Sequence, residues 1–375
     1  MQRSKPMSEL DIKKFVFRKG AAKRIPVSGT FELTSRCNLS CRMCYVHMSK
    51  DEQDKVGREL TTQQWIDLGR EAVDAGMIYL LLTGGEPLLR PDFVEIYTAL
   101  IQMGLLISVN TNATLLTPEI LECFRKYRPE KVNVTLYGMS DETYGSLCCN
   151  SRGYDMAVKG ILALKEARVR VNLNTTFTKL NVHDMNRIVD FAKTHHIPVR
   201  MATYIFPPVR NQHIPEDVNL SPEEIGRSAA YFDWITLDED QKQKRAELIR
   251  KCLSEEPVSV ENQESRISGC MAGRGAFWIS WDGKMYPCGM LSDFTVDAME
   301  LGFTQAWKET CKWVKTMYLP RECLNCKYQS LCPSCAAVFQ SANQATDRVT
   351  NSLCDRTHAY ADAFLEIAEH DAAHS

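Results

Sequence analysis

The sequence lacks any long uninterrupted hydrophobic run. A helix that crosses a membrane needs roughly 18 or more consecutive apolar residues, and no such stretch occurs in the 375 residues. The amino-terminal stretch MQRSKPMSELDIKKFVFRKG is charged throughout and has no apolar centre of the kind that a secretory signal peptide requires. We therefore expect a cytoplasmic protein with no membrane partner.

The sequence also has little net charge. Its 45 Lys and Arg residues nearly balance 47 Asp and Glu residues, which leaves a formal net charge of −2. A protein that binds nucleic acid through its overall field needs a marked positive excess. The balance therefore argues against nucleic acid as a main partner, and the hydrophobic content of 44% is ordinary for a globular protein.

Cysteine, by contrast, is plentiful, with 15 residues in the chain. Cytoplasmic thiols stay reduced, so clustered cysteines there bind metal more often than they form disulfides. The first cluster, CNLSCRMC, contains Cys37, Cys41 and Cys44, one thiolate short of the four ligands that zinc or an iron–sulfur cluster usually takes. Two explanations stay open: a zinc site completed by His47, or a [4Fe–4S] cluster with one iron open to a small molecule.

Short apolar runs alternate with amphipathic helical patterns from residue 29 to about residue 204. The predicted strands cover 29–34, 77–83, 105–111, 131–137, 169–177 and 199–204, and the predicted helices between them cover 61–75, 92–103, 118–126, 154–167 and 184–195. This alternation predicts a parallel sheet with helical crossovers, either doubly wound or forming three-quarters of an eight-stranded barrel.

In both of these folds, ligands bind at the carboxyl ends of the strands. We therefore expect the chemistry to lie in the loops that follow the predicted strands. These loops begin at Ser35, Gly84, Asn112, Gly138 and Lys179.

The pattern changes after residue 204. A proline-rich polar stretch covers 205–224, a helical pattern covers 223–253, and cysteine and glycine dominate from residue 265. The dipeptide Asp282-Gly283 between AFWIS and KMYP predicts a tight β-hairpin. Such a hairpin would bring Cys270 and Cys288 together at its open end.

Two CxxC units follow in CLNCKYQSLCPSC, a pattern typical of zinc or iron–sulfur sites. A four-thiolate zinc site would leave three further cysteines of this region unexplained, whereas two iron–sulfur clusters would use all seven. The seven are Cys270, Cys288, Cys323, Cys326, Cys332, Cys335 and Cys354.

The motifs at three successive strand ends resemble those of the radical S-adenosylmethionine (SAM) superfamily. CNLSCRMC has the family's CxxxCxxC form, LLTGGEP follows the second predicted strand, and VNTNAT (109–114) follows the third. The resemblance covers about residues 28–360. It implies that Cys37, Cys41 and Cys44 hold a [4Fe–4S] cluster whose open iron binds SAM. It also implies SAM contacts from Gly84, Gly85, Glu86 and Asn112, with Glu86 on the methionine amino group.

The carboxy-terminal half resembles the SPASM extension of that superfamily, which occurs on peptide-modifying members. It implies one auxiliary cluster on Cys323, Cys326, Cys332 and Cys354, and another on Cys270, Cys288 and Cys335. The gap between Cys332 and Cys335 is two residues where the family usually has three. The second auxiliary cluster has no assigned fourth ligand, and Cys252 is a candidate.

The resemblance implies an α/β fold: a partial (β/α)6 TIM-like barrel followed by a C-terminal SPASM/twitch iron–sulfur domain. The expected division is an N-terminal segment, the barrel, a linker with a helical bridge, and an auxiliary-cluster domain with a C-terminal helix. These parts cover residues 1–28, 29–205, 206–264 and 265–375.

Further SAM contacts are implied with less specific signals. Tyr45 is expected near adenine, Thr135 and Asn174 near ribose, and Arg152 near the methionine carboxylate, although each residue type also occurs in purely structural roles. The pair Cys148-Cys149 is a candidate hydrogen donor to a substrate radical, or a pair of small apolar side chains. Cys123 and Cys311 are assigned to packing.

The resemblance implies an enzyme that cleaves SAM to a 5′-deoxyadenosyl radical and abstracts hydrogen from a peptide, forming a thioether or carbon–carbon crosslink or an epimerised residue. The alternatives are an anaerobic sulfatase-maturating enzyme and, from another class, a non-catalytic zinc or iron–sulfur binding protein. An electron donor such as flavodoxin or ferredoxin is expected. Because only 36 residues precede Cys37, leader recognition is expected to use a separate protein or the barrel and its extension.

Overall fold

The computed structural model describes residues 9–202, 204–207, 218–254 and 270–374. The strands are β1 (Ser28–Glu32), β2 (Tyr79–Thr83), β3 (Leu106–Thr111), β4 (Lys131–Thr135), β5 (Val171–Thr176), β6 (Val199–Ala202), β7 (Ala276–Ile279), β8 (Lys284–Tyr286) and β9 (Val296–Asp297).

The helices of the first half are α1 (Glu9–Lys23), α2 (Lys50–Val56), α3 (Thr62–Asp74), α4 (Phe93–Gln102), α5 (Pro118–Lys126), α6 (Asp141–Cys148), α7 (Gly153–Glu166) and α8 (Met185–Thr194). Those of the second half are α9 (Pro222–Thr236), α10 (Glu239–Ser254), α11 (Ala298–Leu301), α12 (Phe303–Val314), α13 (Ala336–Asn343) and α14 (Asn351–His374). Short 3-10 turns are η1 (Pro87–Leu89), η2 (Val182–Asp184) and η3 (Arg321–Asn325).

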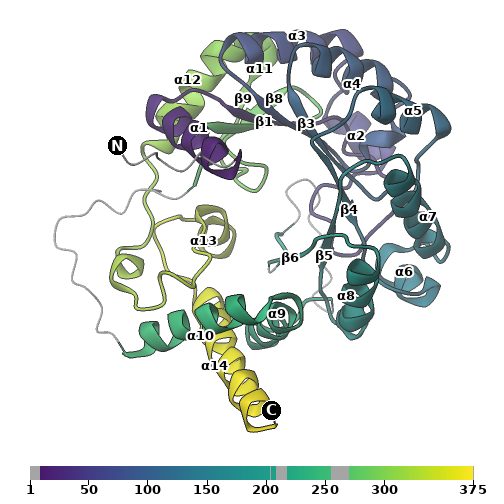
Figure 1. The fold of residues 1–375 in the computed structure, drawn as a ribbon. Coiled ribbons are helices and arrows are strands. Elements are labelled where there is room, and N and C mark those ends of the chain that lie inside the picture. Colours follow the sequence, from purple (N-terminus) through teal and green to yellow (C-terminus); the bar gives the residue numbers. More distant parts are fainter. Residues whose placement is uncertain (1–8, 203, 208–217, 255–269, 375) are drawn as a thin grey trace, which may run out of the picture.

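The strands form one curved sheet in the order β6-β5-β4-β3-β2-β1-β7-β8-β9. The first six strands and β7 are parallel, and β8 and β9 are antiparallel additions. Helices α3, α4, α5, α7 and α8 cover the outside of the curve (Figure 1). The predicted α/β fold is therefore confirmed, and the choice left open by periodicity is resolved in favour of a partial, TIM-like barrel.

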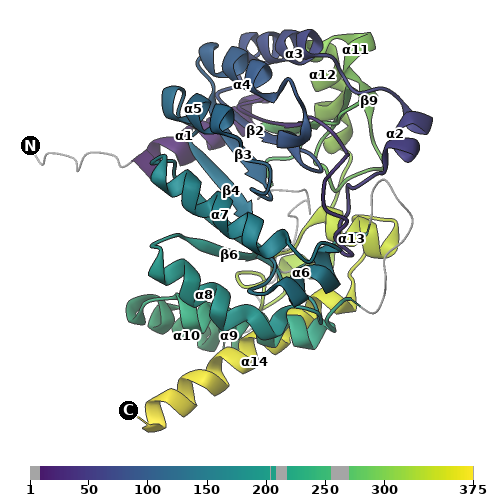
Figure 2. The ribbon, with the colours of Figure 1, turned by 90° about the vertical axis from the view of Figure 1, so that its right-hand side faces the viewer.

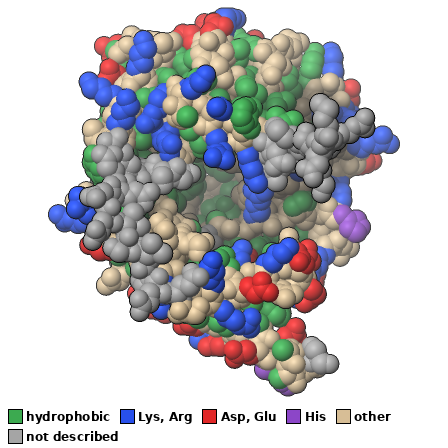
Figure 3. Space-filling model, turned by 60° about the vertical axis from the view of Figure 1, so that its left-hand side comes forward, with side chains coloured by type: hydrophobic (Ala, Val, Ile, Leu, Met, Phe, Trp, Pro, Cys, Tyr) green, Lys and Arg blue, Asp and Glu red, His purple; other side chains and the backbone are tan. Residues whose placement is uncertain are grey.

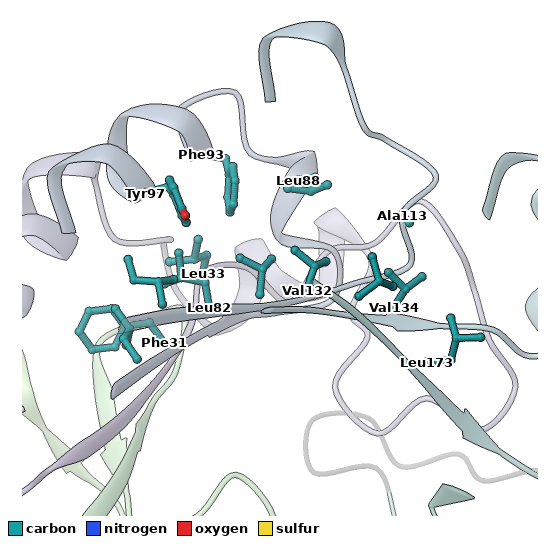
Figure 4. Close-up of a cluster of buried hydrophobic side chains, with 14 of the residues drawn as sticks. Phe31, Leu33, Leu82, Leu88, Phe93, Tyr97, Ala113, Val132, Val134 and Leu173 are labelled. Carbon is teal, nitrogen blue, oxygen red and sulfur yellow. The ribbon is translucent and has the colours of Figure 1, made fainter. Parts of the chain in front are cut away.

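The two faces of the barrel strands differ in polarity. Apolar strand residues such as Phe31, Leu82 and Val134 point toward Phe93 and Tyr97 of α4 or toward the neighbouring helices (Figure 4). Because side chains alternate along a strand, the intervening polar residues face the barrel interior. Three of them form a hydrogen-bonded row across strands β3, β4 and β5: Asn110, Asn133 and Asn172, at 2.8 and 3.4 Å.

The C-terminal hairpin is joined to the barrel sheet. Strand β7 pairs with β1 in parallel register, with Ser28 opposite Ala276. The predicted hairpin is confirmed: β7 and β8 pair around the turn, where Gly283 has a φ of +85°, a conformation that favours glycine. Farther along, α14 packs along α9, and its end projects from the body of the molecule (Figures 1 and 2).

Two parts of the helix prediction need correction. The single helix expected over 223–253 is two helices, because Asp238 begins a new one: its carboxylate accepts the Gln241 amide hydrogen at 2.8 Å, and the Gln241 side chain accepts from the Asp238 amide at 3.1 Å. Helix α1 was not predicted, and Lys13 ties it to Glu130 at 2.7 Å. The predicted domain boundaries stay predictions, and much of the predicted linker, 208–217, lies outside the described residues.

No helix in the described part of the chain combines the length and the apolar character needed to cross a membrane.

Candidate active site

The loops after β1 and β2 lie against each other. The Gly85 amide donates to the Thr34 carbonyl at 2.7 Å, and the Glu86 amide donates to the Arg36 carbonyl at 2.9 Å. A Cβ on Gly84 would lie 2.5 Å from the Thr34 carbonyl oxygen, and one on Gly85 would lie 2.3 Å from the Arg36 carbonyl oxygen. Glycine is therefore required at both positions for this close approach of two backbones.

Glu86 joins this pair of loops to the loop after β3. Its fully buried carboxylate accepts hydrogen bonds from the Leu88 amide at 3.0 Å, the Thr111 hydroxyl at 2.7 Å and the Asn112 amide at 2.7 Å. Burial raises the pKa of Glu86 to about 7, against the opposing effect of these hydrogen bonds. A carboxylate has about four acceptor positions, so one position remains for a cationic ligand group.

Asn112 reaches the cysteine loop directly. Its side-chain amide lies 3.7 Å from the Cys37 sulfur and donates to Asn38 Oδ1 at 2.9 Å. The same side chain accepts from the Thr114 amide at 2.9 Å. The third strand end therefore positions the first cysteine of the CNLSCRMC loop.

The three cysteines of that loop lie together. Burial raises the pKa of Cys37 to about 12 and that of Cys44 to about 11, and the neighbouring Cys41 thiol adds to both shifts. No three His, Cys, Asp or Glu side chains within the described ranges converge closely enough to hold a single metal ion. Partial burial lowers the pKa of His47, against the opposing charge of nearby Glu52. Three partly buried thiols held close together suit an iron–sulfur cluster as well as a zinc site.

A partly buried ion-pair network fixes the start of the cysteine loop. Arg36 Nη2 lies 3.0 Å from Glu59 Oε2, and Arg90 Nη1 lies 3.3 Å from the same oxygen. Arg90 also donates to the Leu33 carbonyl at 3.1 Å, at the end of β1. These positioning residues were not predicted, because an ion pair between residues far apart in sequence leaves no local pattern.

The structure brings some of the other predicted SAM contacts together and leaves one of them exposed. Thr135 and Asn174 are partners in the register of β4 and β5, so the structure brings them side by side. Tyr45 lies near Tyr137, whose pKa it helps to raise. Arg152 is exposed just before α7, so its position adds no support to the predicted role on the methionine carboxylate.

The two adjacent cysteines of α6 have different surroundings. Cys148 is fully buried and hydrogen-bonded to Cys41, and its carbonyl accepts from the Ser40 amide at 3.2 Å. Cys149 is exposed and ends α6 in the left-handed conformation, with a φ of 55°. Cys148 therefore contacts the cysteine loop, and the catalytic role expected of the pair stays a prediction.

The remaining cysteines form two further groups. Cys288 is close enough to Cys270 and Cys335 for their charges to act on its pKa, and the same is true of Cys323 with Cys326, Cys332 and Cys354. These are the two sets that the resemblance implies. Cys252, the candidate fourth ligand of the first set, instead lies 3.1 Å from the hydroxyl of Ser330, in the loop between Cys326 and Cys332.

Residues 31–192 match the model of the family described as "Radical SAM superfamily". An AdoMet-dependent heme synthase of Methanosarcina barkeri is 28% identical over 326 residues, covering 82% of this chain and 90% of that protein. Mycofactocin maturase MftC of Mycobacterium tuberculosis is 25% identical and covers 76% of this chain and 71% of its own. The structure of Streptococcus suis SuiB bound to precursor peptide SuiA has a TM-score of 0.67 at 17% identity, covering 94% of this chain and 83% of SuiB. This last likeness concerns the fold alone.

Proposed function

The chain belongs to the radical SAM superfamily through residues 31–192, and we propose that it abstracts hydrogen from a substrate that carries carboxylate groups. Its cofactors are S-adenosylmethionine and a [4Fe–4S] cluster. The observation that carries the proposal is the junction of three strand-end loops, where Glu86 and Asn112 hold the loop of Cys37 in place.

In this proposal Cys37, Cys41 and Cys44 hold the cluster. Burial raises the pKa of Cys37 and Cys44, so without iron these groups stay protonated thiols, and iron binding would release their protons. When bound, the cluster supplies the electron that cleaves SAM and so makes hydrogen abstraction from carbon available. The residues of the chain bind and orient SAM. The acceptor position of Glu86 that its three hydrogen bonds leave over is proposed to take the methionine ammonium group. Asn112 keeps Cys37 in place from the side.

Other contacts are assigned by position. Thr135 and Asn174, paired across β4 and β5, are proposed to bind the ribose hydroxyls. Tyr45, next to the cysteine loop, is proposed to pack on adenine. The polar interior row of Asn110 and its neighbours supplies hydrogen-bonding groups to the space inside the barrel.

We favour a tetrapyrrole as the substrate class. The heme synthase relative matches the present chain over more of its length than MftC does, and at higher identity. Heme and its precursors are tetrapyrroles with carboxylate side chains. A cation-rich cavity beside the barrel, described below, has complementary chemistry.

A peptide is the second candidate substrate. It is supported by the SPASM-like order of the cysteines, by the relationship to MftC and by the fold shared with the peptide-binding SuiB. Within this candidate, the modification of a ribosomal peptide remains the first choice and sulfatase maturation the alternative. Two auxiliary clusters on the C-terminal cysteine groups, an external electron donor such as flavodoxin or ferredoxin and a separate leader-binding protein belong to this proposal as well.

One experiment tests the function and separates the substrates. The anaerobically reconstituted protein is incubated with SAM, a reductant, and either iron coproporphyrin III or a peptide encoded by a neighbouring gene. We expect 5′-deoxyadenosine and a mass change in the tetrapyrrole, both lost in C41A. A mass change in the peptide alone would select the second candidate. Absence of 5′-deoxyadenosine under every condition would favour a non-catalytic iron–sulfur protein.

A further inference from the structure

A large cavity lies outside the junction of the strand-end loops. It has a volume of about 940 Å³ and is bounded by α8, by β6 and the turn before it, by α9, α10 and α14, and by Leu331 and Pro333. The turn His196–Pro198 leads into the amino end of β6, whereas the cysteine loop follows the carboxyl end of β1. The cavity is therefore a second site and not the place where SAM is expected.

The walls of the cavity are largely apolar. Ile197, Leu331, Phe232 of α9 and Leu237 at the end of α9 contribute from three different segments. The face of the molecule drawn in Figure 3 is hollowed near its centre, with hydrophobic side chains in the hollow and Lys and Arg side chains along its border. A volume within the range of roughly 300–1,000 Å³, apolar walls and a few polar groups are features of small-molecule sites.

The charges that line the cavity are mostly positive. The positive side chains are those of Lys193, Arg200, Arg245 and Arg356, against one acidic side chain, Asp233. That carboxylate is already engaged: it lies 3.3 Å from the Arg245 guanidinium and accepts the Tyr360 hydroxyl at 2.6 Å. The cavity therefore offers an excess of positive charge to an anionic ligand.

Arg356 lies where the cavity meets the C-terminal cysteine group. Its side chain is buried, with 5% exposed, and it lies near Cys332. A smaller cavity of about 190 Å³ shares Met201 and Arg356 with the large one and is lined by Phe177, which directly follows β5. The two cavities together extend from the amino side of β6 toward the carboxyl ends of β5 and β6, which is the side where the cysteine loop lies.

We propose that the large cavity binds a tetrapyrrole through its carboxylates, with the apolar macrocycle against the apolar walls. This inference rests on the tetrapyrrole candidate in the proposed function, and adds to it a binding site with named residues. A tetrapyrrole has a flat apolar macrocycle and several carboxylates, and the cavity has apolar walls and separate cations. A compact anion such as phosphate would contact the cations but leave the apolar walls without a partner. Arginine suits this role because its planar guanidinium binds carboxylates in a bidentate manner.

Binding is tested without turnover. The reconstituted full-length protein, without SAM or reductant, is titrated with coproporphyrin III, a tetracarboxylate porphyrin, and bound ligand is measured by equilibrium dialysis. We expect saturable 1:1 binding that R200E and R245E each weaken by about tenfold or more, the loss expected for one charge-assisted contact. R170E and K244E are the matched controls. Arg170 directly precedes β5, the strand paired with β6, and Lys244 is next to Arg245 in sequence. Neither cation lines the cavity, so binding should be unchanged.

Three outcomes would overturn the inference: no binding of coproporphyrin III, equal binding by R200E and the unaltered protein, or equal binding of a tetracationic porphyrin that has the macrocycle without carboxylates. Displacement of coproporphyrin III by an acidic peptide at lower concentration would assign the cavity to a peptide instead. Arg200 is exposed on β6, so R200E is the variant least expected to disturb folding. Formation of 5′-deoxyadenosine, measured separately, shows whether the proposed SAM chemistry stands when the binding inference fails.

Discussion

The thiol of Cys148 is hydrogen-bonded to the thiol of Cys41, the middle cysteine of the loop that is proposed to hold the cluster. Two backbone bonds support this contact: the amides of Ser40 and Arg42 donate to the carbonyls of Cys148 and Leu147 at 3.2 and 2.9 Å. The end of α6 is thus a support for the cysteine loop.

The first prediction concerns the electronic role of this contact. Once Cys41 binds iron it has no proton to donate, so the S–H of Cys148 becomes the donor to a cluster sulfur. Such donors raise a reduction potential, and a bond worth about 1 kcal/mol corresponds to roughly 40 mV for one electron. C148A should therefore lower the midpoint potential by roughly that amount, measured by a redox titration followed by electron paramagnetic resonance.

C149A is the matched control and should leave the potential unchanged, because Cys149 is exposed and outside the contact. If Cys148 is instead the hydrogen donor to a substrate radical, C148A will stop product formation at an unaltered potential. That result would contradict the tuning role and restore the catalytic prediction made from the sequence.

A second prediction concerns Glu86. E86Q keeps the shape of the side chain but replaces one acceptor oxygen by a donor that faces an amide or a hydroxyl hydrogen. One unsatisfied buried group costs about 1–3 kcal/mol, and the charge that attracts an ammonium is lost. SAM binding, measured by equilibrium dialysis, should weaken at least about tenfold. Unaltered affinity would remove Glu86 from the proposed SAM site.

A third prediction concerns Gly85. In G85A the added Cβ would lie within 2.3 Å of the Arg36 carbonyl oxygen, and backbone on both sides leaves no flexible group to move away. The two loops must then separate, with a loss of roughly 1–3 kcal/mol of the kind seen on overpacking. We expect a lower thermal midpoint and less iron retained. G57A is a suitable control, because a Cβ there would have no neighbour closer than 3.8 Å and the φ of 174° is extended backbone that any residue adopts.

A fourth prediction concerns metal content. With about four iron atoms per cluster, C37A and C323A should each lower the iron per chain by about four after reconstitution. C252A should leave the iron unchanged, because the Cys252 thiol is hydrogen-bonded to the Ser330 hydroxyl. H47A should also retain all iron. Loss of iron from the first site in H47A would show a histidine ligand and contradict the open iron site.

A fifth prediction concerns pH and Asp184. Burial alone would raise its pKa, but hydrogen bonds from the Met139 amide and the Thr143 hydroxyl, at 2.9 and 2.8 Å, hold the pKa below its usual value. Because the pKa of Asp184 is lower in the folded chain than in the unfolded chain, where it is near 3.9, the ionised carboxylate stabilises the fold at pH values above 3.9. This contribution to stability is lost as the pH falls through the pKa of the folded state.

At pH 6 we expect D184A to have a free energy of unfolding about 1–3 kcal/mol below that of the unaltered protein. Between pH 6 and pH 3, the thermal midpoint of the unaltered protein should therefore fall more than that of D184A. D190A, a change of an exposed aspartate on the neighbouring helix α8, should follow the unaltered protein. Parallel curves for D184A and the unaltered protein would contradict the assignment.

Much of the barrel was predictable because local patterns determine it. Each predicted strand from 29–34 to 199–204 overlaps an observed one, although β1 begins one residue before the predicted range, at Ser28. The agreement arises because apolar residues that alternate with polar ones in a strand mark a sheet with one apolar face. The motifs with Cys37 and Glu86 lie at strand ends because the strands before them are short and well bounded. Their convergence then follows from parallel topology.

The unpredicted features all depend on contacts between distant segments. Glu59 and Arg90 are 31 positions apart and meet only because β1 and β2 are neighbours. The separate surroundings of Cys148 and Cys149 follow from where α6 ends, which the sequence shows only to within a few residues. The large cavity lies between β6 and segments that include the distant helix α14, so no local sequence pattern predicts it.

The parallel pairing of Ser28 with Ala276 has a consequence for the order of folding. On the ribosome, β1 is made early, yet one of its edges has no partner until the strand at Ala276 has emerged. Closing such a long loop is slow, because its entropy must be lost before the new contacts form. Nascent chains should therefore expose that edge for most of synthesis, which makes this stage of biogenesis the one most dependent on chaperones.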